Sequence, residues 1–174
     1  QLSGGEKNLL QIAMIANSPR QFYDGHSELV SRFHDIIIEC AIYTLVDVWW
    51  FKKGYFVGKG GPGIRTGGEP ASLHIDRLEY DLLSHISHDS RIGYTDLAEK
   101  VGTTPAIAKY RLEQLESQGV IAGYRLEINH EKLDMLYFKV QLFLSSYQSR
   151  FLKRLFDFCE SNPHITLFIV QLGE

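Results

Sequence analysis

The sequence has few cysteines, no long apolar run and no excess of charge of either sign. Only two cysteines occur among its 174 residues. Cys40 and Cys159 lie in apolar segments of helical periodicity, which favours reduced thiols over a disulfide framework. No run approaches the roughly 20 apolar residues that a membrane-spanning helix needs, and no secretory leader is evident. We therefore expect a cytoplasmic globular protein without a membrane partner.

The charge balance restricts how such a chain could bind nucleic acid. Its 18 Lys and Arg residues face 21 Asp and Glu residues, so the net charge is −3. A bulk positive field that attracts phosphate is therefore absent, and DNA binding would have to come from a local surface.

The sequence also lacks the residue patterns of metal and catalytic sites. Among the histidines, His85 and His88 alone approach ligand spacing, and a solvated pair on one helix face explains them better. No nucleophile stands with a base and an orienting group. We expect no metal, no cofactor, no catalytic residue and no enzymatic activity.

Residues 1–57 are expected to form a β-α-β unit. The apolar run 8–16 has turn residues on both sides and indicates a strand. Ser27 can cap a helix that continues to Cys40, with apolar residues three and four positions apart. Residues 44–51 are β-branched and aromatic, which predicts a strand, and a turn at 52–54 leads into another at 55–57. The glycine-rich and proline-containing stretch 58–72 is expected to be a linker.

Residues 73–134 have the pattern of a winged helix-turn-helix domain. An apolar stripe predicts a first helix over 78–86, and further helices are expected over 95–101 and 104–118, the last ended by Gly119. Gly102 and Thr103 form a tight turn between the second and third helices, which is helix-turn-helix spacing. Alternation over 124–129 predicts the strand of the wing.

Residues 135–174 are expected to form a second β-α-β unit. The apolar runs 137–144 and 165–172 predict strands, and the apolar stripe of 150–159 predicts a helix between them.

The segment 75–133 resembles the DNA-binding domain of the Lrp/AsnC, or feast/famine, transcription regulators. The similarity rests on several short motifs at the family's spacing. These are Ile75-Asp76, Asp81-Leu82-Leu83, Asp89-Ser90-Arg91-Ile92, LAEKVG at 97–102, Arg111-Leu112, Leu115-Glu116 and GVIAGY at 119–124.

The resemblance implies an α+β fold with an effector-binding domain beside the winged helix. In that family the effector domain has β-α-β-β-α-β, ferredoxin-like topology and dimerises through its sheet. Residues 135–174 resemble its first half and residues 1–57 its second half. A fragment of a tandem regulator and a circular permutant both explain this order. The missing initiating Met suggests a fragment, and the turn QLSGGE at the start, which recurs as QLGE at the end, favours the tandem over the permutant.

The opening QLSGGE also resembles the signature loop of ATP-binding cassette proteins. Such an ATPase needs a phosphate loop ending in Gly-Lys-Ser/Thr and a strand that ends in acidic residues. The glycine-rich stretch 58–68 lacks that ending, so an ATPase fragment is only the remote alternative.

By the Lrp/AsnC resemblance, the opening turn lies near a site for an amino acid or related small molecule. The implied effector-binding residues are Gly4, Gly5, Glu6, Asn8 and Gly173. Asn8 stands where the family usually has Asp, and a purely structural turn is the alternative.

The third helix carries the expected contacts with double-stranded DNA. Ala108, Leu112 and Leu115 form its buried stripe, which leaves the first turns facing outward. The expected DNA-binding residues are Thr104, Pro105, Ala106, Lys109, Tyr110 and Arg111, of which Arg111 could equally serve the fold. Glu113 and Glu116 restrict the DNA-facing surface to those turns, so binding is expected to need paired helices from a homo-oligomer.

Two alternatives stay open. The chain could be a small-molecule sensor without DNA binding. An aromatic cluster could form a ligand cage, although packing in a core or dimer interface is favoured. That cluster comprises Trp49, Trp50, Phe51, Tyr55 and Phe56.

Overall fold

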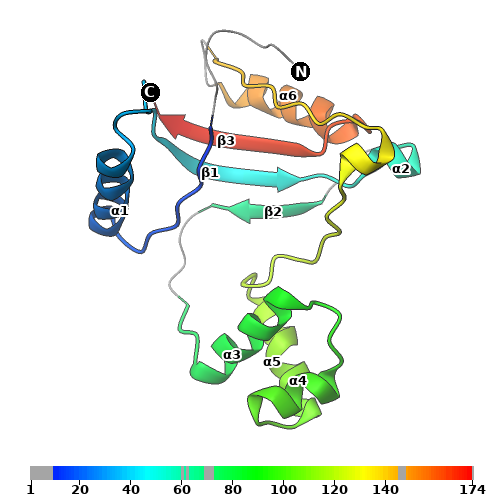
Figure 1. Ribbon diagram of the computed structural model, residues 1–174. Helices are drawn as coiled ribbons and strands as arrows, with labels where there is room; N and C mark the ends of the chain where they lie inside the picture. Colours follow the sequence, from blue (N-terminus) through cyan, green and yellow to red (C-terminus); the bar gives the residue numbers. More distant parts are fainter. Residues whose placement is uncertain (1–9, 60, 62, 69–72, 145–147, 174) are drawn as a thin grey trace. The chain divides into compact units, whose positions relative to one another are not determined.

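The computed structural model describes residues 10–59, 61, 63–68, 73–144 and 148–173 (Figure 1). They divide into two compact units, Gln1–Ile42 with Gly173–Glu174 and Tyr43–Leu172, and each is described by itself. None of the helices in the described ranges is long and apolar enough to cross a membrane.

The first unit contains one helix, α1 (Pro19–Arg32), among its described residues. The Ser18 side chain caps it by accepting a hydrogen bond of 3.2 Å from the Gln21 amide, and Pro19 occupies the first position. The predicted start at Ser27 is therefore wrong, because Ser18-Pro19 is a helix start and not a turn. The predicted strand over 8–16 is also wrong where the structure describes it, since residues 10–16 form no strand.

The second unit contains a three-stranded sheet in the order β2-β1-β3. Its strands are β1 (Tyr43–Trp50), β2 (Ile64–Gly67) and β3 (Leu167–Gly173). β1 and β2 are antiparallel, with Asp47 opposite Gly67 and Trp50 opposite Ile64. The strands predicted at 44–51 and 165–172 are confirmed.

The segment predicted as a linker contributes β2 to this sheet. Just before β2, a Cβ on Gly63 would lie 1.6 Å from the Trp50 carbonyl oxygen. Glycine is therefore the residue that allows the chain to return this close to β1. The strand predicted at 55–57 is also wrong, because Gly54–Val57 forms the short helix α2.

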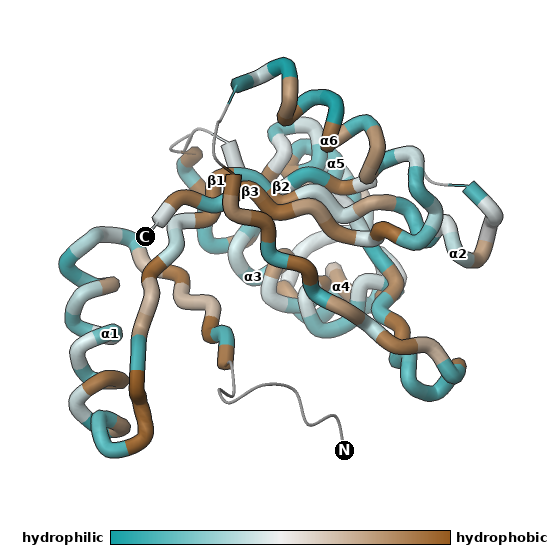
Figure 2. The backbone as a smooth tube through the Cα atoms, turned by 90° about the horizontal axis from the view of Figure 1, so that it is seen from above, coloured by the Kyte–Doolittle hydropathy of each residue, from teal (hydrophilic) through white to brown (hydrophobic). Residues whose placement is uncertain are grey.

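Helix α6 (Ser149–Ser161) covers the sheet through an aromatic contact. The Phe156 ring centroid lies 4.7 Å from that of Trp49 and 5.5 Å from those of Phe51 and Phe168. Figure 2 shows hydrophobic colour along most of β3, whereas α6 alternates between hydrophilic and hydrophobic. The helix predicted over 150–159 is confirmed, and burial raises the pKa of the Cys159 thiol.

The helix-turn-helix consists of α3 (Arg77–His88), α4 (Tyr94–Val101) and α5 (Pro105–Ser117), as predicted. Residues from all three helices form one buried cluster. Its members are Leu82, Leu97, Ala98, Ala108, Leu112 and Leu115. This small apolar core fixes α5 against the other two helices.

Two predicted strands are absent from the second unit. Residues 124–129 and 137–144 have no regular structure, and between them lies the 3₁₀ helix η1 (His130–Leu133). An apolar pattern forms a strand only where a neighbour accepts its backbone hydrogen bonds. The α+β class is confirmed, whereas the two ferredoxin-like halves stay a prediction.

Candidate nucleic-acid interface

The position of α5 depends first on how α3 begins. Asp76 and Glu79 form a capping box, in which the Glu79 amide donates to Asp76 Oδ1 at 2.8 Å. The Asp76 amide donates in return to Glu79 Oε2 at 3.0 Å. Both carboxylates are thereby held at the end of α3 that faces α5.

Arg111 joins this capping box to α5. Its Nη1 atom lies 2.9 Å from Glu79 Oε1 and 3.3 Å from Asp76 Oδ2. Glu79 is only 8% exposed, so its charge needs this partner. Arg111, which was predicted to contact DNA, thus forms an ion pair inside the domain. A role for Arg111 in DNA binding stays a prediction.

The turn between α4 and α5 has the geometry that a helix-turn-helix requires. Gly102 ends α4 in the left-handed region at φ 72°, which costs glycine little. The Thr103 amide then donates to the Ala98 carbonyl at 2.9 Å. Gly119 ends α5 in the same way, at φ 75°, as the sequence predicted.

The first turns of α5 present an exposed surface. Thr104 caps the helix by accepting a hydrogen bond of 3.3 Å from the Ile107 amide, and Pro105 takes the first position. The predicted contact residues Pro105, Ala106, Lys109 and Tyr110 are all exposed. The structure therefore brings the predicted set, except Arg111, to one accessible stretch of helix.

The polar groups on this surface already have partners on α5 itself. Lys109 Nζ lies 3.7 Å from Glu113 Oε1, and both side chains are more than half exposed. Gln114 Nε2 donates to the Tyr110 hydroxyl at 2.8 Å. Solvated contacts of this kind are weak, so a phosphate could replace either one at small cost.

The electrostatic balance of the domain is unfavourable for DNA. Residues 75–122 contain five Lys and Arg residues against eight Asp and Glu residues, a net charge of −3. Of the five cations, Arg77, Lys109 and Arg111 lie beside carboxylates. Phosphate attraction by one copy is consequently modest.

Sequence reasoning missed three exposed residues near this surface. Ile107, the third residue of α5, is 45% exposed. Arg91 and Lys100, in the turn before α4 and in its last turn, show no ion pair within the described residues. Arg91 could have been found as a cation with no acidic residue three or four positions away, whereas Lys100 has Asp96 four positions before it and Ile107 gave no charge signal.

Four of the five predicted effector-binding residues lie outside the described residues. These are Gly4, Gly5, Glu6 and Asn8, whereas Gly173 is the last residue of β3. Across the described part of the chain, no group of three or more His, Cys, Asp or Glu side chains could hold a metal ion.

Comparison with known proteins defines the class of the helical domain. Residues 75–122 match the winged helix-turn-helix DNA-binding family. The chain is 44% identical over 59 residues to an uncharacterized HTH-type transcriptional regulator of Pyrococcus furiosus, covering 34% of the chain and 38% of the relative. No solved structure matches the chain with significance.

Two further relatives carry the names of Lrp-type regulators. The chain is 38% identical over 60 residues to the leucine-responsive regulatory protein of Haemophilus influenzae, covering 34% of the chain and 36% of the relative. It is 36% identical over 59 residues to the HTH-type transcriptional regulator LrpA of Pyrococcus horikoshii, covering 34% and 42%. The predicted Lrp/AsnC relationship is confirmed for this segment, and the match spans about two fifths of each relative's length.

Proposed function

We propose that the protein is a sequence-specific, DNA-binding transcription regulator of the Lrp/AsnC type. The observation that carries the proposal is the exposed N-terminal half of α5, held by a packed three-helix core. In helix-turn-helix proteins the second helix of the motif enters the major groove with its N-terminal residues against base edges. The match of residues 75–122 to winged helix-turn-helix DNA-binding domains supports the same assignment.

Each exposed residue of α5 has a role in this proposal. The Ala106 amide, which has no acceptor within the first turn of α5, faces a phosphate, as helix N-termini favour anions. Lys109 contacts a phosphate or a guanine edge, and Tyr110 a phosphate or a thymine methyl group. Arg111 holds α5 in position from inside the domain.

Two copies of the domain act together in this account. The net charge of −3 over residues 75–122 leaves one copy with little phosphate attraction. A homo-oligomer presents two recognition helices to half-sites on one face of DNA, which adds their contacts. A small molecule, an amino acid in the first instance, would change DNA affinity by changing that spacing.

A titration against random double-stranded DNA at two salt concentrations tests the proposal. Fluorescence anisotropy of a labelled duplex should report binding that weakens as salt rises, because each neutralised phosphate contributes a slope of about −0.9 in log K against log salt. A folded chain whose anisotropy signal stays flat at micromolar concentrations would contradict it.

The acidic balance of the domain favours one second candidate, a small-molecule sensor that does not bind DNA. Its helix-turn-helix would then serve only as a packing module. The same titration separates the two functions, because the sensor leaves the duplex unbound at both salt concentrations.

A further inference from the structure

The second unit contains an open cavity of about 660 Å³ that the proposed DNA contacts do not use. One wall is the end of β1 with the turn after it, and the other is the segment 124–130 that follows the helix-turn-helix in sequence. Its aromatic lining includes Trp50, Phe51, Tyr124 and Tyr137. A volume in this range is typical of sites for small organic molecules.

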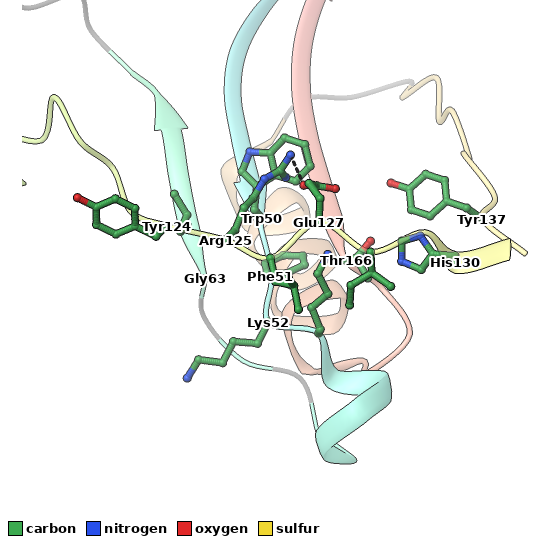
Figure 3. A pocket seen from close by; sticks show the side chains of 14 residues that line it. Trp50, Phe51, Lys52, Gly63, Tyr124, Arg125, Glu127, His130, Tyr137 and Thr166 are labelled. Carbon is green, nitrogen blue, oxygen red and sulfur yellow. Dashed lines mark ion pairs between the residues drawn. The ribbon is translucent and has the colours of Figure 1, made fainter. Parts of the chain in front are cut away.

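Specific contacts join the two walls. The Arg125 guanidinium carbon lies 3.4 Å from the Trp50 ring centroid. The Tyr55 hydroxyl and His130 Nε2 share a hydrogen bond of 3.0 Å at the other end. Figure 3 shows Trp50, Arg125 and Glu127 gathered on one side of the cavity, and His130 and Tyr137 on the other.

The backbone of the exit segment is held just before the cavity begins. A Cβ on Gly123 would lie 2.9 Å from Ile64 Cδ1, and Gly123 has φ 148°. The chain that leaves the helix-turn-helix therefore passes directly over β2 before it lines the cavity. A molecule in the cavity touches this exit segment and the sheet at once.

The charges of the lining favour an anionic ligand. Lys52, Lys53 and Arg125 are cationic, whereas Glu127 is the one carboxylate among the lining residues that the structure describes. Glu127 is paired with Arg125 at 2.5 Å. Neither lysine has a carboxylate partner among the described residues, and Lys53 is half-buried. Figure 3 shows Lys52 extending away from the other labelled side chains, so the proposal uses the positive charge of Lys53.

We propose that this cavity is a binding site for a small aromatic carboxylate. The aromatic lining takes the planar body of the ligand, and Lys53 offsets its negative charge. This site makes the aromatic residues Trp50 and Phe51 part of a ligand cage. As a regulatory site it rests on the proposed function, because its ligand would order the segment that leaves the DNA-binding domain.

Calorimetric titration of the whole chain with phenylacetate and indole-3-acetate tests the site, with phenylacetamide and indole-3-acetamide as uncharged controls. We expect at least one carboxylate to bind, and its own amide to bind about two- to fivefold more weakly or worse, since an exposed ion pair contributes this much. Failure of both carboxylates to bind at millimolar concentration, or equal affinity for acid and amide, would overturn the proposal.

Charge variants of the lining residues distinguish an anion site from a purely apolar contact. Only an anion site changes its carboxylate affinity with the sign of the charge that is removed. Lys53→Gln should weaken the carboxylate about two- to fivefold, whereas Lys59→Gln, outside the lining, should leave it unchanged. Glu127→Gln should strengthen it, because Arg125 loses its carboxylate partner. Equal carboxylate affinities of the Lys53→Gln and Lys59→Gln variants would contradict the proposed anion site.

The DNA titration is performed on the same sample, so the two proposals fail separately. Carboxylate binding without DNA binding keeps the cavity and removes the regulator. DNA binding with no carboxylate binding keeps the regulator and removes the cavity as a ligand site.

Discussion

Arg111 is the residue whose surroundings distinguish a structural role from a DNA contact. Its side chain is 34% exposed, and its guanidinium lies against two carboxylates at the start of α3. Removing it leaves Glu79, at 8% exposure, without a cation. The residue therefore stabilises the orientation of α5 before any DNA is present.

We predict that Arg111→Ala lowers the free energy of unfolding by about 1–3 kcal/mol, because a nearly buried carboxylate loses its partner. Urea unfolding followed by circular dichroism measures this. Arg77→Ala is the matched control, since its pair with Asp81 is solvated and its loss should cost at most about 0.5 kcal/mol. If Arg111→Ala leaves stability unchanged and reduces the slope of log DNA-binding constant against log salt by about 1, Arg111 contacts DNA instead.

Tyr124 gives the protein a predicted pH dependence in alkali. Burial, followed by a hydrogen bond of 3.0 Å to Glu116, raises the pKa of Tyr124 to about 12. An acid whose folded pKa exceeds its unfolded value of about 10 contributes stability that is complete below pH 10 and is lost as the pH rises through 12. We predict that Tyr124→Phe reduces the fall in unfolding free energy between pH 10 and pH 12. An identical fall in both proteins would contradict the assignment.

At the scale of the elements, local signals predicted the helix-turn-helix well. The apolar stripe of α5, its Thr104 cap and the glycine after its end all act within a few residues, so the sequence contains them. The exposed set Pro105, Ala106, Lys109 and Tyr110 followed from the same stripe. The partnership of Arg111 with Glu79 could not be derived, because the two residues are 32 positions apart and no local pattern joins them.

The strands were predicted less well because a strand depends on a partner. β2 was missed because its neighbourhood is rich in glycine, although Ile64 and Thr66 are β-branched. Conversely, residues 10–16 and 137–144 have apolar runs of strand length but no ladder. Strand pairing depends on two segments, so the residue pattern of one segment does not predict whether it will pair.

Helix α1 carries a glycine in its interior that offers a direct test of its stability. We predict that Gly25→Ala stabilises α1 by up to about 1 kcal/mol, because alanine loses less backbone entropy in a helix. A Cβ there would meet only the Met14 ε-methyl group, at 2.9 Å, which is the end of a flexible side chain. Thermal melting at 222 nm measures the change. Gly102→Ala, at φ 72°, should destabilise α4 instead, and equal effects of both substitutions would contradict this account.

At the scale of the whole molecule, the segment 136–144 exposes an apolar face at alternate positions. Its members are Leu136 (72% exposed), Phe138 (73%), Val140 (80%), Leu142 (59%) and Leu144 (48%). Apolar side chains at every second position are the pattern of a strand with one apolar face. This face is the strongest support in the chain for a homo-oligomer.

We predict self-association through this segment at micromolar concentration, measured by sedimentation velocity. Val140→Lys should shift the chain towards the monomer, because a charge on the apolar face opposes its burial. Gln141→Lys places the same charge on the other face of the segment and should have a much smaller effect. Equal shifts in both variants, or a monomer at every concentration, would remove this interface.

The central claim is that the exposed start of α5 binds DNA. The most direct measurement is the affinity of the chain, Lys109→Ala, Tyr110→Ala and the α6 control Lys153→Ala for one random duplex at low salt. The account predicts a loss of about 1 kcal/mol or more for each α5 variant and none for Lys153→Ala. Equal affinities in all four proteins, with each shown to be folded, would contradict it.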